Sequence, residues 1–139
     1  MIGSKIFLDT APFIYILEDN AQYSAKLRAA VSRYYAENIA LCTSLLTITE
    51  YCVIPYRQNE IQKITDFESF IFDASINILP LDKQVAKYAS WLRATYCSIK
   101  AMDALQLATA IQNKCDVFLT NDKQLRQVDK IRVLLVDEL

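Results

Sequence analysis

The sequence predicts an α/β protein with a central, mostly parallel β-sheet that helices cover on both faces. Short apolar runs of strand length alternate along the 139 residues with longer segments of helical periodicity, which is typical of this class. The composition, with 53% hydrophobic residues, can form a packed core and argues against a disordered chain. We therefore expect residues 1–139 to form one domain.

The first half of the chain is expected to hold two strands and four helices. Strands are predicted over 5–8 and 39–42, where short apolar runs occur. Thr10 is expected to cap the first helix, with Pro12 in its first turn. The next three helices are expected from Asp19 or Asn20 to about Glu37, from Thr43 or Ser44 to Arg57, and over about 59–73.

The second half is expected to add three strands and three helices. Residues 75–79 alternate in polarity, while 116–120 and 131–136 are apolar runs that suit buried strands. A long helix is expected to start at Pro80 and Asp82, and a short one at Asp122. Between them, the stretch 100–111 has the periodicity of a helix.

Several classes of protein are excluded by missing residues. The chain has no histidine, which excludes imidazole acid–base catalysis and histidine zinc sites. A single glycine, Gly3, excludes the glycine-rich loops that bind nucleotides. The four cysteines are scattered without a CxxC pair, so we expect buried free thiols in a reducing cytoplasm (Cys42, Cys52, Cys97 and Cys115).

The sequence predicts a cytoplasmic protein that does not cross a membrane. No apolar run is long enough to span a bilayer. The amino-terminal segment meets Lys5 and Asp9 at once, so we expect that it is not a secretory signal.

Two acids follow predicted strands directly. Asp9 comes after the run Ile6-Phe7-Leu8, and Asp122 comes just after the strand predicted over 116–120. Functional side chains in parallel sheets lie beyond the carboxyl ends of the strands. Each acid is explained equally well as the N-cap of the next helix.

Two further acids stand on otherwise apolar helix faces. Glu50 shares its expected face with Leu46 and Val53, and Asp103 shares one with Leu107, while Gln106 belongs to a separate polar stripe. A buried carboxylate is costly unless its charge is compensated. The structural alternatives are an ion pair of Glu50 with Arg57, and stabilisation of Asp103 by the helix dipole and Lys100.

The combination of four such acids predicts a shared site for a divalent cation. Carboxylates crowded together repel each other, and the oxygen-binding ions Mg²⁺ or Mn²⁺ would relieve that repulsion. Such an ion can activate water against a phosphodiester without histidine or a covalent nucleophile. Without these four acids, the 16 acidic residues fall to 12 against 15 basic ones. A subset of the basic residues is then available to face a polyanion, although a solvated surface explains most of them (Lys26, Arg28, Arg33, Arg57, Lys100, Lys123, Arg126 and Lys130).

The segments around these acids resemble the acidic motifs of a known family. Four segments resemble, in their order and spacing, the acidic motifs of PIN-domain ribonucleases, and especially those of VapC-type toxins. These segments are LDTAPFIYILE, ITEYCV, KAMDALQLATA and FLTND. The resemblance covers essentially the whole chain. It implies a three-layer α/β/α PIN-like domain and Mg²⁺- or Mn²⁺-dependent hydrolysis of RNA. Asp9, Glu50, Asp103 and Asp122 match the four family acids, and Thr120 and Asn121 match polar positions that orient the fourth acid or the attacking water.

The resemblance also implies partners. It implies a homodimer, and a small antitoxin protein whose tail covers the acidic crevice. Apolar residues of the early helices are candidates for the antitoxin contact, with core packing as the alternative for most of them (Phe13, Ile14, Tyr15, Leu17, Tyr34 and Tyr35).

Other functions remain open at the level of sequence. One alternative is a catalytically silent PIN-like module that binds RNA or protein. Another is a phosphatase or signalling domain with an aspartate nucleophile. Cleavage of DNA rather than RNA is also compatible with the resemblance.

Overall fold

The structure, a computed structural model, describes residues 5–139. Gly3 and the start of the amino-terminal segment, which was expected not to be a secretory signal, lie outside the described residues. No helix of residues 5–139 is both long and apolar enough to cross a membrane.

The centre of the fold is a five-stranded sheet in the order β3-β2-β1-β4-β5. All four strand pairings are parallel, which confirms the predicted sheet type. The observed strands agree with the predicted ones within two residues at each end: β1 (Lys5–Leu8), β2 (Ala40–Ser44), β3 (Asn77–Leu79), β4 (Val117–Thr120) and β5 (Arg132–Leu135). Because every strand runs the same way, all the carboxyl ends meet at one edge of the sheet.

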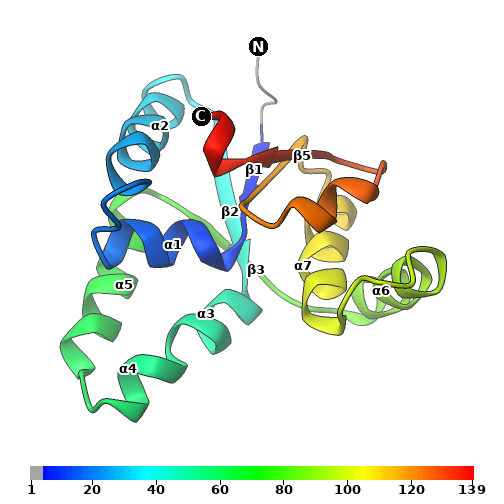
Figure 1. Cartoon of the computed structure of the whole chain (residues 1–139), viewed down its shortest axis with the longest axis horizontal. Helices are drawn as coiled ribbons and strands as arrows, with labels where there is room; N and C mark the ends of the chain where they lie inside the picture. The colour runs from blue at the N-terminus through cyan, green and yellow to red at the C-terminus, as the bar shows by residue number, and fades with distance from the viewer. Residues whose placement is uncertain (1–4) are drawn as a thin grey trace.

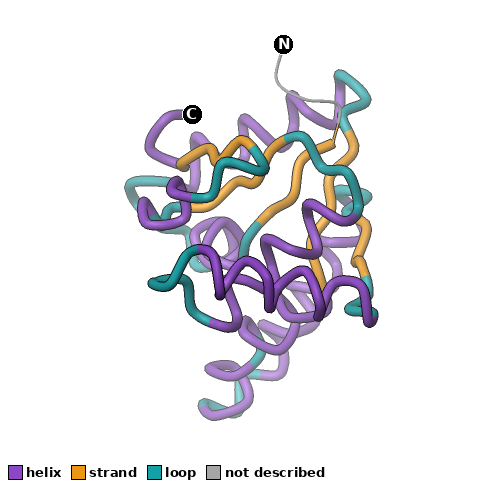
Figure 2. The backbone as a smooth tube through the Cα atoms, turned by 90° about the vertical axis from the view of Figure 1, so that its right-hand side faces the viewer, coloured by secondary structure: helices purple, strands orange, loops and turns teal. Residues whose placement is uncertain are grey.

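Helices cover both faces of the sheet, as predicted. The helices α1 (Thr10–Leu17), α2 (Ser24–Ala36) and α5 (Ile61–Asp73) pack on one face, and α6 (Lys83–Thr95) and α7 (Ala101–Gln112) on the other (Figure 1). Figure 2 looks onto the face that α6 and α7 cover. The alternation along β1 explains the two cores, because Ile6 and Leu8 enter the first and Phe7 enters the second.

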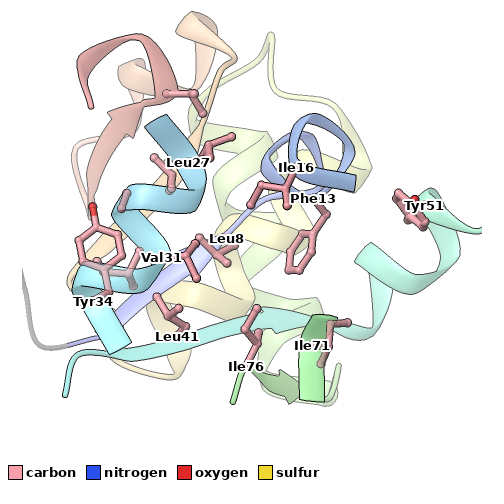
Figure 3. Packing of buried hydrophobic residues seen from close by; sticks show 14 of the residues in the cluster. Leu8, Phe13, Ile16, Leu27, Val31, Tyr34, Leu41, Tyr51, Ile71 and Ile76 are labelled. Carbon is pink, nitrogen blue, oxygen red and sulfur yellow. The ribbon is translucent and has the colours of Figure 1, made fainter. Parts of the chain in front are cut away.

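The core of the first face is formed mainly by large, buried side chains. Phe13 of α1 lies beside Leu8 of β1, and the same core cluster includes Leu27 and Tyr34 of α2 and Ile71 of α5 (Figure 3). On the second face, the rings of Phe7 and Phe118 stack with their centroids 5.2 Å apart. These packed cores anchor the strand ends that carry the candidate acids.

Some helix starts differ from the predicted ones. Asp9 is the N-cap of α1, because its side chain accepts a hydrogen bond from the Thr10 N–H. This confirms the capping alternative considered for Asp9, whereas the expectation that Thr10 is the cap is wrong. The second helix begins at Ser24, because the Asn20 side chain accepts hydrogen bonds from two amides of the turn that precedes it, those of Gln22 and Tyr23. The predicted caps Ser44 and Asp82 are confirmed.

The single helix expected up to Arg57 is two helices, α3 (Leu45–Tyr51) and α4 (Val53–Arg57). Pro55 explains the break, because its nitrogen has no hydrogen to donate to the Tyr51 carbonyl one turn earlier. The helix expected over 59–73 begins at Ile61. The short helix after Asp122 is the 3₁₀ turn η1 (Lys123–Gln127), and a second such turn, η2 (Val136–Glu138), follows β5.

The cysteines are free thiols, as predicted. Cys42, Cys52 and Cys115 are buried, but Cys97 is exposed, so the expectation of burial is wrong for that residue. Cys97 lies in the connection between α6 and α7 rather than inside an element.

Five helices end on a left-handed residue that is not glycine, which follows from a sequence with a single glycine. In each case the next amide donates to a carbonyl five residues earlier, as Cys115 does to Ala110 and Ile76 does to Ile71. The left-handed residues are Asp19, Asn38, Asn59, Ser75 and Lys114. A side chain with a β-carbon is disfavoured in this conformation.

Glycine at these helix ends should therefore stabilise the protein. We expect Lys114→Gly and Ser75→Gly each to raise the free energy of unfolding by about 0.5–1 kcal/mol, because the β-carbon penalty is removed. Urea unfolding measures the change. The control is Ala29→Gly, at an exposed position inside α2, which should destabilise by a similar amount. Destabilisation by all three substitutions would contradict this account of the helix ends.

Candidate functional site

Asp9 lies at the carboxyl end of β1, the central strand of the sheet, and only 9% of it is exposed. One carboxylate oxygen accepts a hydrogen bond of 2.9 Å from the Thr10 N–H. The other accepts one of 2.8 Å from the hydroxyl of Thr120, at the end of the neighbouring strand β4. The residue is thus both a helix cap and part of the predicted site, and the two roles are compatible.

The environment of Asp9 disfavours its charge. Burial raises the pKa of Asp9 from 3.8 to about 6, and the negative charges of Asp103 and Glu50 act in the same direction. The hydrogen bonds from Thr120 and Thr10 oppose this shift without cancelling it. A buried carboxylate next to other carboxylates is the environment that a bound cation would relieve.

Glu50 is placed on α3 beside the start of α1. Its Oε1 accepts a hydrogen bond of 2.6 Å from the hydroxyl of Thr10, the residue after Asp9. The expectation that Glu50 lies on a buried apolar face is wrong, because Glu50 and its neighbour Val53 are exposed. Helix α3 ends at Tyr51, so Glu50 lies in the last turn of a short helix and not in the middle of the long helix on which that expectation rested.

Asp103 lies in the first turn of α7 and is half-buried. Burial raises the pKa of Asp103 above its ordinary value, and the charges of Asp122 and Glu50 raise it further, while Lys100 lowers it. The separate polar stripe predicted on this helix exists, but it faces the protein interior, since Gln106 is only 1% exposed.

Asp122 follows β4 and caps η1, accepting a hydrogen bond of 3.0 Å from the Gln124 N–H. Its own N–H donates to the Thr120 hydroxyl at 3.2 Å, so this hydroxyl connects Asp9 and Asp122. Asn121 donates from Nδ2 to the hydroxyl of Tyr15 at 3.3 Å, and its buried Oδ1 has no partner within residues 5–139.

The four predicted acids come from four different elements, and the structure brings them within electrostatic reach of one another. Asp9 interacts with Asp103 and Glu50, and Asp103 interacts with Asp122 and Glu50. None of the ion pairs formed within residues 5–139 involves any of the four. Their mutual repulsion is therefore only partly offset by basic side chains.

The donor chemistry of these acids fits a hard divalent cation, since all four side chains are carboxylates. Asn121, the residue before Asp122 in the chain, has a neutral oxygen, Oδ1, that is buried without a hydrogen-bond partner in residues 5–139. The described residues nevertheless contain no group of three or more acidic or cysteine side chains close enough to hold an ion as they stand. The four acids thus suit a divalent cation in the type of their ligand atoms and in their uncompensated negative charge.

Thr10 is a site residue that the sequence interpretation missed, because it was assigned only as a helix cap. Its hydroxyl connects the Asp9 segment to Glu50 across 40 residues of chain. A hydroxyl directly after a strand-terminal aspartate, as in LDT, is the signal that could have indicated it.

Several of the candidate cations have other partners. Arg28 bonds to Asp19 and Arg126 pairs with Glu138. Lys130 lies over the ring of Trp91, with its Nζ 5.7 Å from the ring centroid. For these residues the alternative of an ordinary mixed surface is the better explanation.

The chain matches a family model and a group of solved structures. The PIN domain model matches residues 6–131. VapBC2 from Rickettsia felis, solved bound to a promoter DNA fragment, has a chain with a TM-score of 0.81 and 14% identity, covering 94% of this chain and 98% of that one. VapBC from Salmonella typhimurium, solved bound to DNA, has a chain with a TM-score of 0.73 and 20% identity, covering 95% of this chain and 98% of that one.

A third similar structure is VapC20 from Mycobacterium tuberculosis, a toxin that cleaves the sarcin–ricin loop. Its TM-score is 0.66 at 14% identity, covering 91% of this chain and 98% of that one. None of the curated proteins matches this sequence significantly. At these identities the solved structures establish the fold alone, whereas the family model spans most of the sequence. The chain therefore belongs to the PIN domain family, as the sequence motifs predicted.

Proposed function

We propose that this protein is a divalent-metal-dependent endoribonuclease and the toxin of a toxin–antitoxin pair. The family supports this assignment, because PIN-domain nucleases generally use divalent metal ions. Toxin–antitoxin proteins share its fold, including a toxin that cleaves the sarcin–ricin loop of RNA.

The observation that carries the proposal is the uncompensated charge at the carboxyl edge of the sheet. Asp9 is nearly buried, has a raised pKa, and interacts with two further carboxylates. A purely structural helix cap gains nothing from such neighbours, because they disfavour its ionised form. A nuclease site does gain, because a cation bound there meets several negative oxygens at once.

The reaction we propose is hydrolysis of an RNA phosphodiester bond. A bound Mg²⁺ or Mn²⁺ would supply activation of the attacking water and neutralisation of charge on the phosphate. The water oxygen attacks phosphorus, the bond to the 3′ oxygen breaks, and the products carry a 3′-hydroxyl and a 5′-phosphate. The proton lost by water is taken up by a carboxylate and is then returned to the departing 3′ oxygen, which becomes the hydroxyl.

We assign a separate proposed role in this reaction to each of the site residues. Asp9, Asp103 and Asp122 are the proposed metal ligands, and Glu50 is a further ligand or the base that orients the water. The Thr120 hydroxyl orients Asp9 through its 2.8 Å hydrogen bond, and Asn121 is proposed to orient Asp122 or the attacking water.

A protein partner is supported by an apolar groove of about 630 Å³ between α3, α4, α5 and β3. Its rim includes Phe72, which is 84% exposed, and Tyr56, which is 64% exposed. Of the early-helix candidates for an antitoxin contact, Ile14 and Tyr35 are exposed, whereas Phe13 and Tyr34 are core residues. We propose an antitoxin and a second copy of the chain as the partners of these apolar surfaces.

A second candidate function is a PIN module that binds RNA or protein without cleaving it. The observation that favours it is that the described acids do not form a ready group of three metal ligands. The raised pKa of Asp9 favours the nuclease, because carboxylates whose charge is disfavoured by burial and by neighbouring acids are typical of catalytic sites.

Removal of the Asp103 carboxylate should abolish cleavage without unfolding the protein. We expect Asp103→Asn to lower the rate of RNA cleavage at saturating Mg²⁺ by at least about 100-fold, since a charged ligand is lost. A fluorophore–quencher RNA assay measures the rate, and circular dichroism verifies the fold. The matched control is Asp73→Asn at an exposed acid of α5, which should cleave normally. Equal activity of the two variants would refute the assignment.

Metal removal should stop cleavage reversibly. We expect excess EDTA to abolish RNA cleavage and added Mn²⁺ to restore it, because the carboxylates alone cannot neutralise the phosphate. Mass spectrometry should find a 5′-phosphate on one product, and DNA of the same sequence should remain intact. A phospho-aspartate trapped at Asp9 would instead indicate the phosphatase alternative. Tight RNA binding with no product in any divalent metal would indicate the silent module.

Asp9→Asn should stabilise the metal-free protein in a pH-dependent way. The folded state holds the Asp9 proton up to about pH 6, whereas the unfolded chain releases it near 3.8, so wild-type stability falls as the pH rises between these values. Asparagine does not titrate. Relative to the difference at pH 4, the variant should therefore gain about 2–3 kcal/mol at pH 7.5.

Urea unfolding at the two pH values measures this gain. Mg²⁺ should then stabilise the wild-type protein at pH 7.5 and have little effect on the variant. Parallel stability profiles of the two proteins would show that Asp9 carries no uncompensated charge.

A further inference from the structure

Four buried polar side chains form a continuous hydrogen-bonded bridge where β2, α3 and α7 meet. Gln106 of α7 donates from Nε2 to the Thr47 hydroxyl at 2.9 Å and accepts from the Ser44 hydroxyl at Oε1. The hydroxyls of Thr47 and Thr43 lie 2.7 Å apart, and Thr43 donates to the Leu8 carbonyl at 2.8 Å. We call Thr43, Ser44, Thr47 and Gln106 the polar bridge.

The polar bridge connects the three backbone segments that carry Asp103, Glu50 and Asp9. Gln106 follows Asp103 by one turn of α7, and Thr47 precedes Glu50 by one turn of α3. The carbonyl that Thr43 contacts belongs to the residue immediately before Asp9. Each end of the bridge is therefore attached next to a different candidate acid.

The bridge crosses the carboxyl edge of the sheet. Gln106 lies on α7, which covers the second face, whereas α3 leaves the end of β2 and packs beside α1. The Ser44 hydroxyl also accepts from the Leu46 N–H at 3.0 Å, which joins the N-cap of α3 to the same network. Polar side chains thus join the two helices across this edge.

Stability is a poor explanation for a glutamine in this position. Its exposed fraction is 1%, and those of Thr43, Ser44 and Thr47 are all 0%. An apolar side chain of the same size would bury as much surface without the cost of dehydrating an amide. What a satisfied polar network adds is one defined arrangement of the elements that it joins.

We propose that Gln106 is a positioning residue of the acid site, holding the helix of Asp103 at a set distance from the helix of Glu50 and from the strand of Asp9. This inference rests on the proposed function. The acids repel one another, so their backbones must be held together by something other than the acids themselves. Metal sites tolerate displacements of only about 0.5 Å in their ligands.

The test compares two substitutions on the same helix. Gln106→Met keeps the side-chain length and removes both hydrogen bonds of the bridge. The control is Thr109→Val, at a fully buried position one turn later, where valine has the same shape as threonine. Within residues 5–139 the Thr109 hydroxyl bonds only to the Leu105 carbonyl of its own helix. Both variants lose a buried polar group, but only the first loses a link between elements.

The readouts are Mn²⁺ affinity, followed by electron paramagnetic resonance without RNA, and kcat and KM for RNA cleavage. We expect Gln106→Met to lower Mn²⁺ affinity and kcat by about 10–100-fold, as the loss of an outer partner of a metal site commonly does. The KM for RNA should change little. Thr109→Val should retain both Mn²⁺ affinity and kcat.

Equal effects of the two substitutions, or wild-type values for Gln106→Met, would overturn the positioning role while leaving the nuclease assignment intact. Failure of the wild-type chain to bind Mn²⁺ and cleave RNA would overturn the nuclease assignment and the positioning role together. If Gln106→Met does not fold, Thr47→Val breaks the same bridge from the α3 side. Its Mn²⁺ affinity and kcat are then compared with those of Thr109→Val, and the positioning role is judged by the same criteria.

Discussion

Repulsion between carboxylates at one edge of a parallel sheet is the interaction on which the rest of the site depends. Parallel strands bring Asp9 and the segment of Asp122 to the same edge, and helices on opposite faces add Glu50 and Asp103. Burial and neighbouring negative charge raise the pKa of Asp9 and of Asp103. A site of this kind is costly to the folded protein, and the cation that we propose would relieve that cost.

Neutral hydroxyl groups make this arrangement tolerable in the absence of a cation. Thr120 donates to Asp9, and Thr10 donates to Glu50, so two of the acids keep a hydrogen bond without receiving a positive charge. A lysine in place of either threonine would neutralise the site and compete with a metal ion. Hydroxyl donors instead hold the oxygens while leaving the negative charge available.

Local signals predicted the elements well and their ends less well. The period of the apolar residues identified the five strands and the main helices, because strands and helices repeat at clearly different intervals. The break before α4 and the late start of α2 depend on one missing hydrogen bond at Pro55 and on two side-chain hydrogen bonds of Asn20, which periodicity does not record. The identity of the family also followed from sequence, since its acidic motifs lie in the predicted order.

The sequence by itself determined the parallel α/β class, the strand-terminal positions of Asp9 and Asp122, and the candidate acids on helices. Only the tertiary structure decided that Glu50 is exposed, that Thr10 reaches it, and that Gln106 enters a buried network. The physical reason is the range of the interactions. Periodicity and capping act within a few residues, whereas the contacts of Thr10 with Glu50 and of Gln106 with Ser44 join residues 40 and 62 positions apart.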